Sequence, residues 1–324
     1  MKLTYSNHTL FCVLLGISVV MLGAYTRLSD AGLGCPDWPG CYGNIIVPSS
    51  KQSVIEAHQA FPNAMPVTPY KAWLEMLHRY LAGSLVLVVL AMIYRHYKKH
   101  STIPNRLWFI PGLMFLQAAF GMWTVTWKLH PLAVMPHLAG GMTLVSLLWW
   151  HRLSCQKHSK RKIAYGFWAL LFLICLQILL GGWTSSNYAA LICADFPYCK
   201  GSLWPQMNFY EAFNVMNLPV GLNYEGGLMS TAARVSIQMT HRFMASIVFI
   251  SVFASMIWLM IKHHQHRNQS LIIISLLFIQ VILGITNVLA SLPIWSATLH
   301  NTVALLLVLS LLSLIHQIQY EPSK

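Results

Sequence analysis

The sequence predicts an all-α integral membrane protein whose eight transmembrane helices form two four-helix bundles related by a pseudo-twofold axis. Of the 324 residues, 56% are hydrophobic and only 9% are charged, and the mean hydropathy is +0.56. A soluble domain carries roughly a quarter charged residues. Apolar runs of bilayer length recur along the chain, and one half of the sequence repeats the other. These observations exclude a soluble globular protein.

Eight apolar runs have the length of about 20 residues that a helix needs to cross a bilayer. They lie at approximately 10–28, 73–94, 107–127, 131–151, 164–184, 232–261, 270–290 and 295–317. The first run is the weakest because it contains Gly16, Ser18 and Gly23. We interpret it as an uncleaved helix and not as a signal peptide. Only Lys2 is charged before it, and no small-x-small cleavage site precedes Arg27.

The charged residues predict how the chain crosses the membrane. Thirteen of the 21 basic residues lie on one side of the spans: Lys2, Arg95, Lys98, Lys99, Arg106, Arg152, Lys157, Lys160, Arg161, Lys162, Lys262, Arg267 and Lys324. The positive-inside rule places this side, with both termini, in the cytoplasm. Two long loops, about 29–72 and 185–231, then lie outside, which for a bacterial inner membrane is the periplasm. The net charge of +13 sits in short loop clusters, so it does not indicate nucleic-acid binding.

The two outer loops begin with related sequences. GAYTRLSDAGLGCPDWPGCYG at 23–43 aligns with GGWTSSNYAALICADFPYCKG at 181–201, with nine identical positions at an offset of 158. Further along, EMLHRYLAG at 75–83 aligns with QMTHRFMAS at 238–246 at an offset of 163. Self-similarity over such a length predicts two copies of one structural unit.

The repeat predicts an N-terminal four-helix bundle at 1–162 and a C-terminal four-helix bundle at 163–324. Four crossings return the chain to the side from which it started, so both bundles have the same topology. We therefore expect a parallel repeat, related by a pseudo-twofold axis along the membrane normal.

Four histidines inside the apolar spans indicate a function. His78 and His137 are 59 residues apart, and so are His241 and His300. Ionisable rings are expensive inside a membrane and are usually functional there. Two imidazoles on different helices are what a haem iron needs for six-coordinate ligation. All four lie at a similar depth below the outer boundary, which predicts two haems side by side, one per bundle, toward the periplasmic side.

A purely structural role and a non-haem metal both fit the histidines less well than haem does. Core histidines that are hydrogen-bonded across helices would account for a single ring, but not for four that match in repeat position and depth. A metal other than haem iron is not expected, because no carboxylate or thiol cluster repeats with the histidines.

The halves differ beside the first histidine of each pair. Glu75 lies three residues before His78, so the two share one helix face, and its counterpart is Gln238. A carboxylate near an iron-bound ring can act as a base or stabilise positive charge on a reacting carbon, which an amide cannot do. We therefore predict chemistry in the first half. The alternative is that Glu75 only pairs with Arg79 or Lys71.

Arg79 and Arg242 directly follow the first histidine in each half. They are possible partners for haem propionates. Alternatively, their side chains extend outward to the membrane surface.

The outer loops carry two matched cysteine pairs, Cys35 with Cys41 and Cys193 with Cys199. The compartment outside the membrane is oxidising, so we predict two disulfides, each within one loop. They either staple the loops or exchange electrons with another thiol protein.

The chain resembles the haem A synthase family of bacteria and mitochondria over nearly its whole length. The resemblance rests on the eight helices in two bundles and the paired-cysteine loops, together with Glu75-x-x-His78-Arg79, His137, His241-Arg242 and His300. The combination is specific to the family, although no single piece is.

This resemblance implies a reaction and a role for each site residue. His78 and His137 would bracket the substrate, haem O, while His241 and His300 would ligate a permanent haem b. Glu75 matches the family's catalytic carboxylate. The reaction would oxidise the C8 methyl group of haem O to a formyl group by successive hydroxylations, with electrons passing to an acceptor that the sequence does not identify. Haem O synthase would be the upstream partner.

Two other function classes remain open at this point. A non-enzymatic dihaem b-type cytochrome that carries electrons within the membrane would use the same four histidines, but gives no reason for Glu75. A quinone-linked thiol oxidoreductase would use the outer disulfides, but leaves the histidines without a role.

Overall fold

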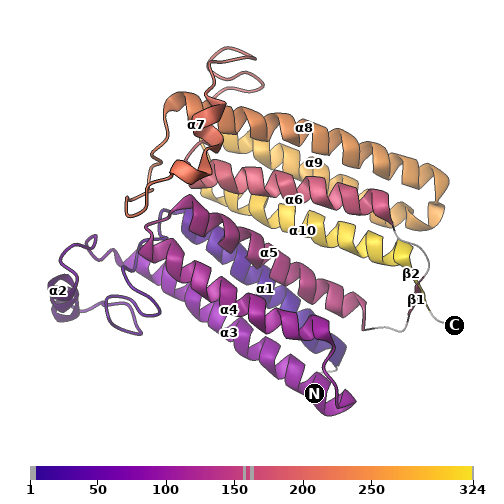
Figure 1. Ribbon diagram of the computed structural model, residues 1–324, viewed down its shortest axis with the longest axis horizontal. Helices are drawn as coiled ribbons and strands as arrows, with labels where there is room; N and C mark the ends of the chain where they lie inside the picture. The colour runs from indigo at the N-terminus through magenta and orange to yellow at the C-terminus, as the bar shows by residue number, and fades with distance from the viewer. Residues whose placement is uncertain (1–4, 156–157, 161–163, 323–324) are drawn as a thin grey trace. The chain divides into compact units, whose positions relative to one another are not determined.

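The computed structural model describes residues 5–155, 158–160 and 164–322. Within these ranges, eight helices are long and apolar enough to cross a membrane (Figure 1). They are α1 (Tyr5–Leu28), α3 (Pro69–His100), α4 (Asn105–Thr126), α5 (Pro131–Leu153), α6 (Tyr165–Ser186), α8 (Thr231–Lys262), α9 (Arg267–Leu289) and α10 (Ile294–Gln319). They overlap the eight predicted spans, so the predicted all-α membrane fold class is confirmed. The membrane orientation predicted from the basic residues rests in part on Lys2, Lys157, Arg161, Lys162 and Lys324, which lie outside the described residues.

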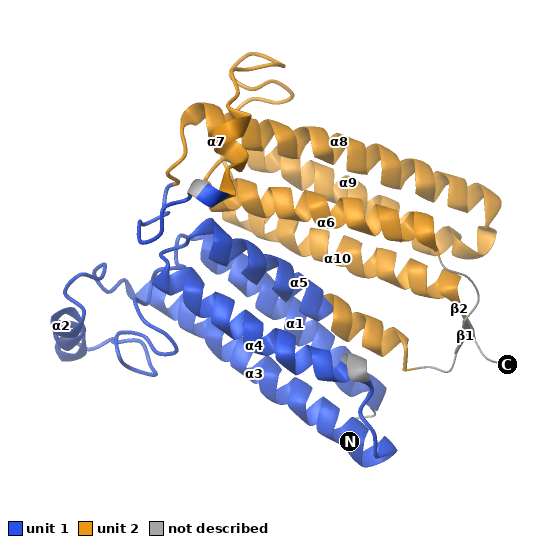
Figure 2. Cartoon of the chain, viewed as in Figure 1, with its two compact units in different colours: residues 1–145, 216–226 blue, residues 146–215, 227–324 orange. Residues whose placement is uncertain are grey.

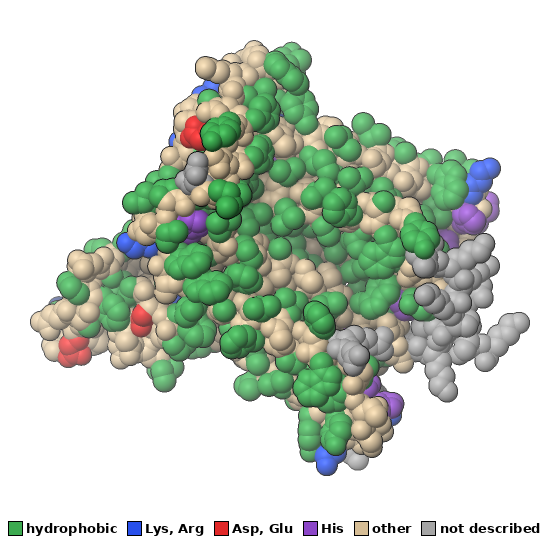
Figure 3. Space-filling model, viewed as in Figure 1, with side chains coloured by type: hydrophobic (Ala, Val, Ile, Leu, Met, Phe, Trp, Pro, Cys, Tyr) green, Lys and Arg blue, Asp and Glu red, His purple; other side chains and the backbone are tan. Residues whose placement is uncertain are grey.

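Large apolar side chains cover the outer faces of these helices. Leu87 is 70% exposed, Phe115 76%, Phe172 62% and Ile250 66%. In Figure 3, hydrophobic side chains cover most of the drawn face along the helices. Continuous apolar surface of this kind marks contact with another apolar phase, which for helices of this length is the lipid bilayer.

The helix that carries His78 is longer than the apolar run at 73–94 predicts, whereas the helix that carries His241 matches its run at 232–261 to within one residue at each end. α3 and α8 each have 32 residues. Pro69 begins α3, where its fixed φ and missing N–H suit the first turn. The last turn of α3 carries Lys98 and Lys99, whose positive charges complement the partial negative charge at a helix C-terminus. Its first and last turns therefore extend α3 beyond the apolar stretch.

Short elements lie in the loops between the spans. The outer loops contain α2 (Lys51–Ala60), α7 (Phe209–Phe213) and the 3-10 turn η1 (Val215–Asn217), and the turn η2 (His264–His266) precedes α9. Two three-residue strands, β1 (His158–Lys160) and β2 (Tyr320–Pro322), pair antiparallel. The sequence did not predict these elements, because they are too short for periodicity to reveal them.

The chain divides into two compact units (Figure 2). The first consists of residues 1–145 and 216–226, and the second of residues 146–215 and 227–324. The first unit contains α1 to α4 and most of α5, while the second contains α6 to α10. The predicted division at residue 162, which came from the sequence repeat, stays a prediction.

One segment of the second outer loop, residues 216–226, belongs to the first unit because Tyr224 packs there. The side chain of Tyr224 is 1% exposed, and its ring lies 4.7 Å from that of His130. The backbone N–H of Tyr224 donates to the carbonyl of Lys128 over 3.0 Å. A buried aromatic side chain contributes large apolar burial, which holds this segment against the end of α4.

The same tight turn joins the third and fourth spans of each half. Lys128 and Leu129 have positive φ, as do Ser291 and Leu292, 163 residues later. The N–H of Leu129 donates to the carbonyl of Thr124 over 2.7 Å, and that of Leu292 to Asn287 over 2.8 Å. The repeat seen in the sequence is thus also present in local backbone structure, within each unit taken alone.

Candidate functional site

Each of the four predicted haem ligands lies against a glycine on a neighbouring helix. The pairs are His78 (α3) with Gly23 (α1), His137 (α5) with Gly121 (α4), His241 (α8) with Gly181 (α6), and His300 (α10) with Gly284 (α9). A Cβ atom at Gly23 would lie 2.7 Å from Cε1 of the histidine, and a Cβ at the other three glycines would lie 3.2 Å from it. Glycine is therefore what lets each ring sit between its two helices.

These glycines are functional candidates that the sequence alone did not reveal. Gly23 and Gly181 are repeat partners at an offset of 158, and Gly121 and Gly284 at an offset of 163. Their identity between halves was visible in the sequence. Their contact with the histidines was not, because it depends on which helices become neighbours in space.

The structure brings His78 and His137 together. Their ring centroids are 6.4 Å apart, and the ring planes are nearly perpendicular, at 84°. With metal–imidazole bonds of about 2 Å, two rings on opposite sides of one metal have centroids roughly 6 Å apart. Both side chains are half-buried, and neither Nδ1 atom has a hydrogen-bond partner among the described residues. The pair fits a metal held between two imidazoles.

The ligand chemistry around the histidines also fits haem. Among the described residues, no group of three or more His, Cys, Asp or Glu side chains is close enough to hold a metal ion. A metal with only two protein ligands must bring its other ligands with it, as haem iron does with the four nitrogens of its macrocycle. The donor set is therefore the one a six-coordinate haem requires.

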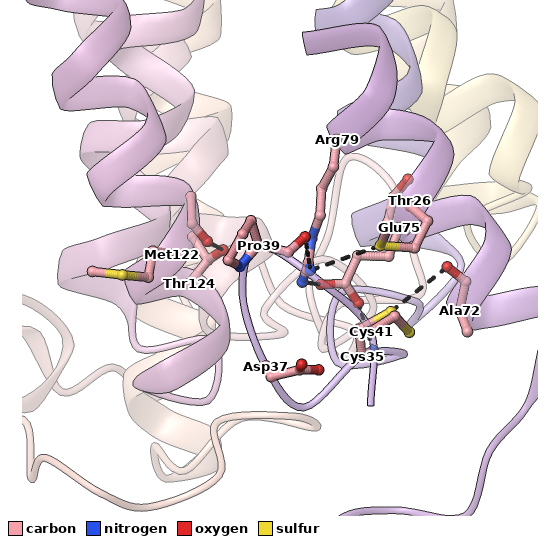
Figure 4. A network of polar contacts seen from close by, with 12 residues as sticks. Thr26, Cys35, Asp37, Pro39, Cys41, Ala72, Glu75, Arg79, Met122 and Thr124 are labelled. Carbon is pink, nitrogen blue, oxygen red and sulfur yellow. Dashed lines mark hydrogen bonds and ion pairs between the residues drawn. A yellow bond between two sulfur atoms is a disulfide. The ribbon is translucent and has the colours of Figure 1, made fainter. Parts of the chain in front are cut away.

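Glu75 is buried beneath the first outer loop. The residue is 5% exposed. Oε2 accepts from the backbone N–H of Cys35 over 2.9 Å, and Oε1 accepts from Arg79 over 2.5 Å. Figure 4 shows the carboxylate between Arg79 and the loop that carries Cys35. The structure thus contains the ion pair that the sequence offered as the alternative to a catalytic carboxylate, which still leaves the catalytic role as a prediction.

Arg79 and Arg242 clamp the outer loops onto the helices. Arg79 also donates to the carbonyls of Pro39 and Gly40 (Figure 4). Arg242 donates to the carbonyls of Tyr198, over 2.8 Å, and Cys193, over 3.1 Å. A haem propionate would have to share these guanidinium groups with the loop carbonyls, and propionate pairing stays a prediction.

Gln238 occupies the position of Glu75 in the second unit. The residue is 4% exposed, and its Oε1 has no hydrogen-bond partner among the described residues. Arg242 bonds to a loop carbonyl of Cys193, whereas its counterpart Arg79 bonds to a carboxylate. The replacement of Glu75 by Gln238 between the two halves therefore changes the buried contacts: the first unit has a carboxylate paired with an arginine, and the second does not show this pair at the matching residues.

Both predicted cysteine pairs form disulfides in the structure, Cys35 with Cys41 and Cys193 with Cys199. All four cysteines are fully buried. The first pair packs with Ala72 and Met76 of α3, and the second with Val235 and Met239 of α8. Exchange with another thiol protein needs direct attack on a sulfur atom, so this burial favours the stapling role.

An aspartate folds each disulfide loop in the same way. Asp195 accepts from the backbone N–H of Lys200 over 2.9 Å and of Gly201 over 2.8 Å. Asp37 accepts likewise from Tyr42, over 2.6 Å, and Gly43, over 2.8 Å. A carboxylate that caps two N–H groups holds the loop in a closed turn next to the disulfide.

The second loop is expected to loosen in acid. The N–H of Gly201 first, and that of Lys200, hold the pKa of Asp195 below its ordinary value. A carboxyl whose folded pKa is depressed stabilises the fold above its unfolded pKa of about 4, and this contribution is lost as pH falls through the folded value. Reduction of Cys193–Cys199 by a phosphine should therefore accelerate below about pH 4. Asp195→Asn is the control: its rate should lack this acid-dependent step, and equal pH profiles for the two proteins would contradict the assignment.

Comparison with known proteins gives a consistent result. The family described as cytochrome oxidase assembly protein matches residues 6–312. A heme A synthase of Shewanella oneidensis is 40% identical over 312 residues, covering 94% of each chain. A heme A synthase of Neorickettsia sennetsu is 26% identical over 350 residues, covering 94% of this chain and 96% of its own. A heme A synthase of Brucella anthropi is 25% identical over 329 residues, covering 93% of this chain and 88% of its own.

Proposed function

The chain belongs to the cytochrome oxidase assembly protein family, and we propose that it is a haem A synthase that oxidises the C8 methyl group of haem O to a formyl group. One observation supports placing the reaction at the first histidine pair and not at the second. The chain has two matched histidine pairs, and among the described residues the first has a buried carboxylate, Glu75, one helical turn from its histidine, where the second has the amide of Gln238. An electron carrier with two equivalent haems needs no such difference.

The two histidine pairs have different roles, one for the substrate and one for a resident cofactor. His78 and His137 hold the substrate, haem O, in the first unit. His241 and His300 hold a resident haem b in the second unit, and this group, when bound, transfers one electron at a time. The spacing of 6.4 Å between the rings of His78 and His137, and the glycine beside each ring, support a macrocycle between them.

The reaction balances with water as the oxygen source and an external electron acceptor. The methyl group and water give a hydroxymethyl group, two protons and two electrons. A second hydroxylation gives the geminal diol with the same release of protons and electrons, and loss of water from the diol leaves the formyl group. The electrons pass to an acceptor of unidentified class, and haem O synthase supplies the substrate upstream.

Glu75 acts where positive charge develops. A carboxylate next to the reacting carbon stabilises a cationic methyl carbon, or orients the water that attacks it. The ion pair with Arg79 and the N–H of Cys35 keep the carboxylate in one orientation, so no reorganisation is needed when charge appears.

The chain lies in a membrane, and we place it in the bacterial inner membrane with both termini in the cytoplasm. The disulfide loops and the outer ends of α3, α5, α8 and α10 then face the periplasm, and both haem sites lie toward that side. This orientation agrees with the oxidising compartment that disulfides require.

The proposal is tested by extracting haems from membranes of a host that makes haem O, with and without this protein. Mass analysis should detect haem A, or its hydroxylated intermediate, only in membranes that contain the protein. If haem O is available, an electron acceptor is present and neither product forms, the protein is not a haem A synthase.

Histidine variants should separate the two haems. His300→Ala is expected to lose haem b, because a six-coordinate iron loses one of its two protein ligands. His137→Ala should keep haem b but fail to hold haem O or haem A. Haem extraction from each purified variant measures both contents. Loss of haem b in His137→Ala with haem O retained would reverse the assignment of the sites.

The second candidate function is an electron-transfer cytochrome. The ion pair between Glu75 and Arg79 favours it, because this pair gives the carboxylate a structural reason to be present. This function predicts that the haems extracted from the purified protein are haem b alone.

A further inference from the structure

We propose that side-chain amides decide which haem stays and which exchanges: Gln177 anchors His241 in the second unit, and Val19 at the matching position leaves His78 free to release the substrate haem. The inference rests on the proposed function, since it assigns a resident haem to one site and a substrate to the other. It names Gln177 as a positioning residue and concerns haem retention, not the chemical step.

Gln177 of α6 fixes the ring of His241 on α8. Its Nε2 lies 3.1 Å from Nδ1 of His241 and donates to the backbone carbonyl of the same residue, also over 3.1 Å. The amide thus ties the imidazole to its own backbone. An imidazole that binds iron through Nε2 carries its proton on Nδ1, and a flipped Gln177 amide accepts from that N–H through Oε1 in place of the present contact. Such contacts orient metal-binding rings and hold them in place.

Among the described residues of the first unit, no side-chain amide makes the matching contact with His78. At an offset of 158, the position of Gln177 is taken by Val19 on α1, which cannot form a side-chain hydrogen bond. Nδ1 of His78 has no hydrogen-bond partner among the described residues. The ring of His78 is therefore held by the backbone of α1, through its close approach to Gly23 and a polar interaction with the backbone of Val19, and by whatever metal it binds.

The second histidine of each pair shows the same difference. In the second unit, Nε2 of Gln280 lies 3.2 Å from Nε2 of His300. In the first unit, the matching Gln117 donates to the carbonyl of Pro136 over 3.4 Å. Nδ1 has no partner among the described residues in either His137 or His300, so the two histidines differ in the amide contact alone. An amide therefore reaches each histidine of the second unit.

Gly140 explains why Gln117 turns away from His137. The amide of Gln117 lies where a Cβ atom at Gly140 would stand. At an offset of 163, the second unit has Val303 at this position, which carries a side chain where Gly140 has none. Gln280 cannot take the same path and contacts His300 instead. Two independent sequence differences, Val19 and Gly140, thus remove amide contacts from the same pair of histidines.

The consequence is a difference in the rate at which a ligand ring can leave iron. A tied ring that dissociates stays in place and rebinds, whereas an untied ring can rotate away. A substrate site must release its product, and a permanent site must not. Changes to residues that orient metal ligands typically alter metal affinity by about tenfold to a hundredfold.

Reciprocal variants test the proposal in the full-length protein. Transfer of each haem to an excess of haem-free myoglobin gives a release rate, with haem b and haem O distinguished by mass. Gln177→Val should release haem b about tenfold faster, with no change in haem O release. Val19→Gln should release haem O about tenfold more slowly. Gly140→Val, which redirects Gln117, should act in the same direction as Val19→Gln and serves if that variant does not fold.

The outcomes separate this inference from the proposed function. If the wild-type protein takes up no haem O, the proposed function fails. If it binds both haems but the reciprocal variants leave both release rates unchanged, only the anchoring role of Gln177 is overturned. The low-spin absorption bands of haem b should persist in Gln177→Val, since both of its iron ligands remain.

Discussion

Replacing Glu75 with glutamine is expected to stop haem A formation while both haem sites stay filled. Glutamine has nearly the same shape and can still accept from the N–H of Cys35, which lies 2.9 Å from Oε2. It cannot neutralise a developing positive charge or take a proton. Removing a positioned general base or charge stabiliser lowers a rate about a hundredfold or more. The measurement is haem A formed per bound haem O in the purified variant.

The variant also breaks the contact between Glu75 and Arg79, so a stability control is needed. Removing one partner of a buried ion pair costs about 3–5 kcal/mol where the remaining charge is left uncompensated. Arg79 keeps its bonds to the carbonyls of Pro39 and Gly40, which limits this cost. Gln238→Glu is the matched change in the second unit and should leave haem A formation intact. Full activity of Glu75→Gln, with both haems bound, would remove the carboxylate from the mechanism.

Adding a single methyl group at Gly23 is expected to weaken the binding of haem O. The new Cβ would lie 2.7 Å from Cε1 of His78, a distance that forces the ring to move. Overpacking of this kind costs about 1–3 kcal/mol, or roughly tenfold in the affinity for haem O. Gly121→Ala should have a smaller effect, because its Cβ would lie 3.2 Å from Cε1 of His137. Titration of haem O into each purified variant measures the loss.

Two other glycines of the first unit provide the control for this prediction. A Cβ at Gly83 in α3, or at Gly112 in α4, would meet no other atom within 4 Å. Gly83→Ala and Gly112→Ala should therefore bind haem O like the wild type, and slightly stabilise their helices. If Gly23→Ala bound haem O as tightly as these controls, His78 would not be held as a ligand in the way described here.

The spans and the histidine pairs could be predicted because both are properties of the chain alone. A helix that crosses a bilayer must be apolar over about 20 residues, and a polar ring inside it stands out against that background. The repeat adds a second, independent observation, since His78 and His241 occupy matching positions in the two halves. The fold class and the candidate ligands therefore follow from local composition and spacing.

The contacts around the ligands could not be predicted in the same way. Gly23 and Gly121 become significant only when α1 packs against α3 and α4 against α5. Likewise, the sequence offered Arg79 either a haem propionate or the membrane surface. The structure gives it two loop carbonyls, because residues 35–41 fold back over the end of α3. Such pairings depend on loop conformation, which no periodicity in the sequence encodes.

The most direct test of the account is a single-turnover reaction in the purified protein. The chain would be loaded with haem b in the second unit and haem O in the first, mixed with an electron acceptor, and its haems extracted over time for mass analysis. The account predicts that haem O disappears through a hydroxylated intermediate to haem A, while the amount of haem b stays constant. If both haems remained unchanged while they passed electrons to the acceptor, the protein would be an electron-transfer cytochrome, and the proposed catalytic site around Glu75 would be wrong.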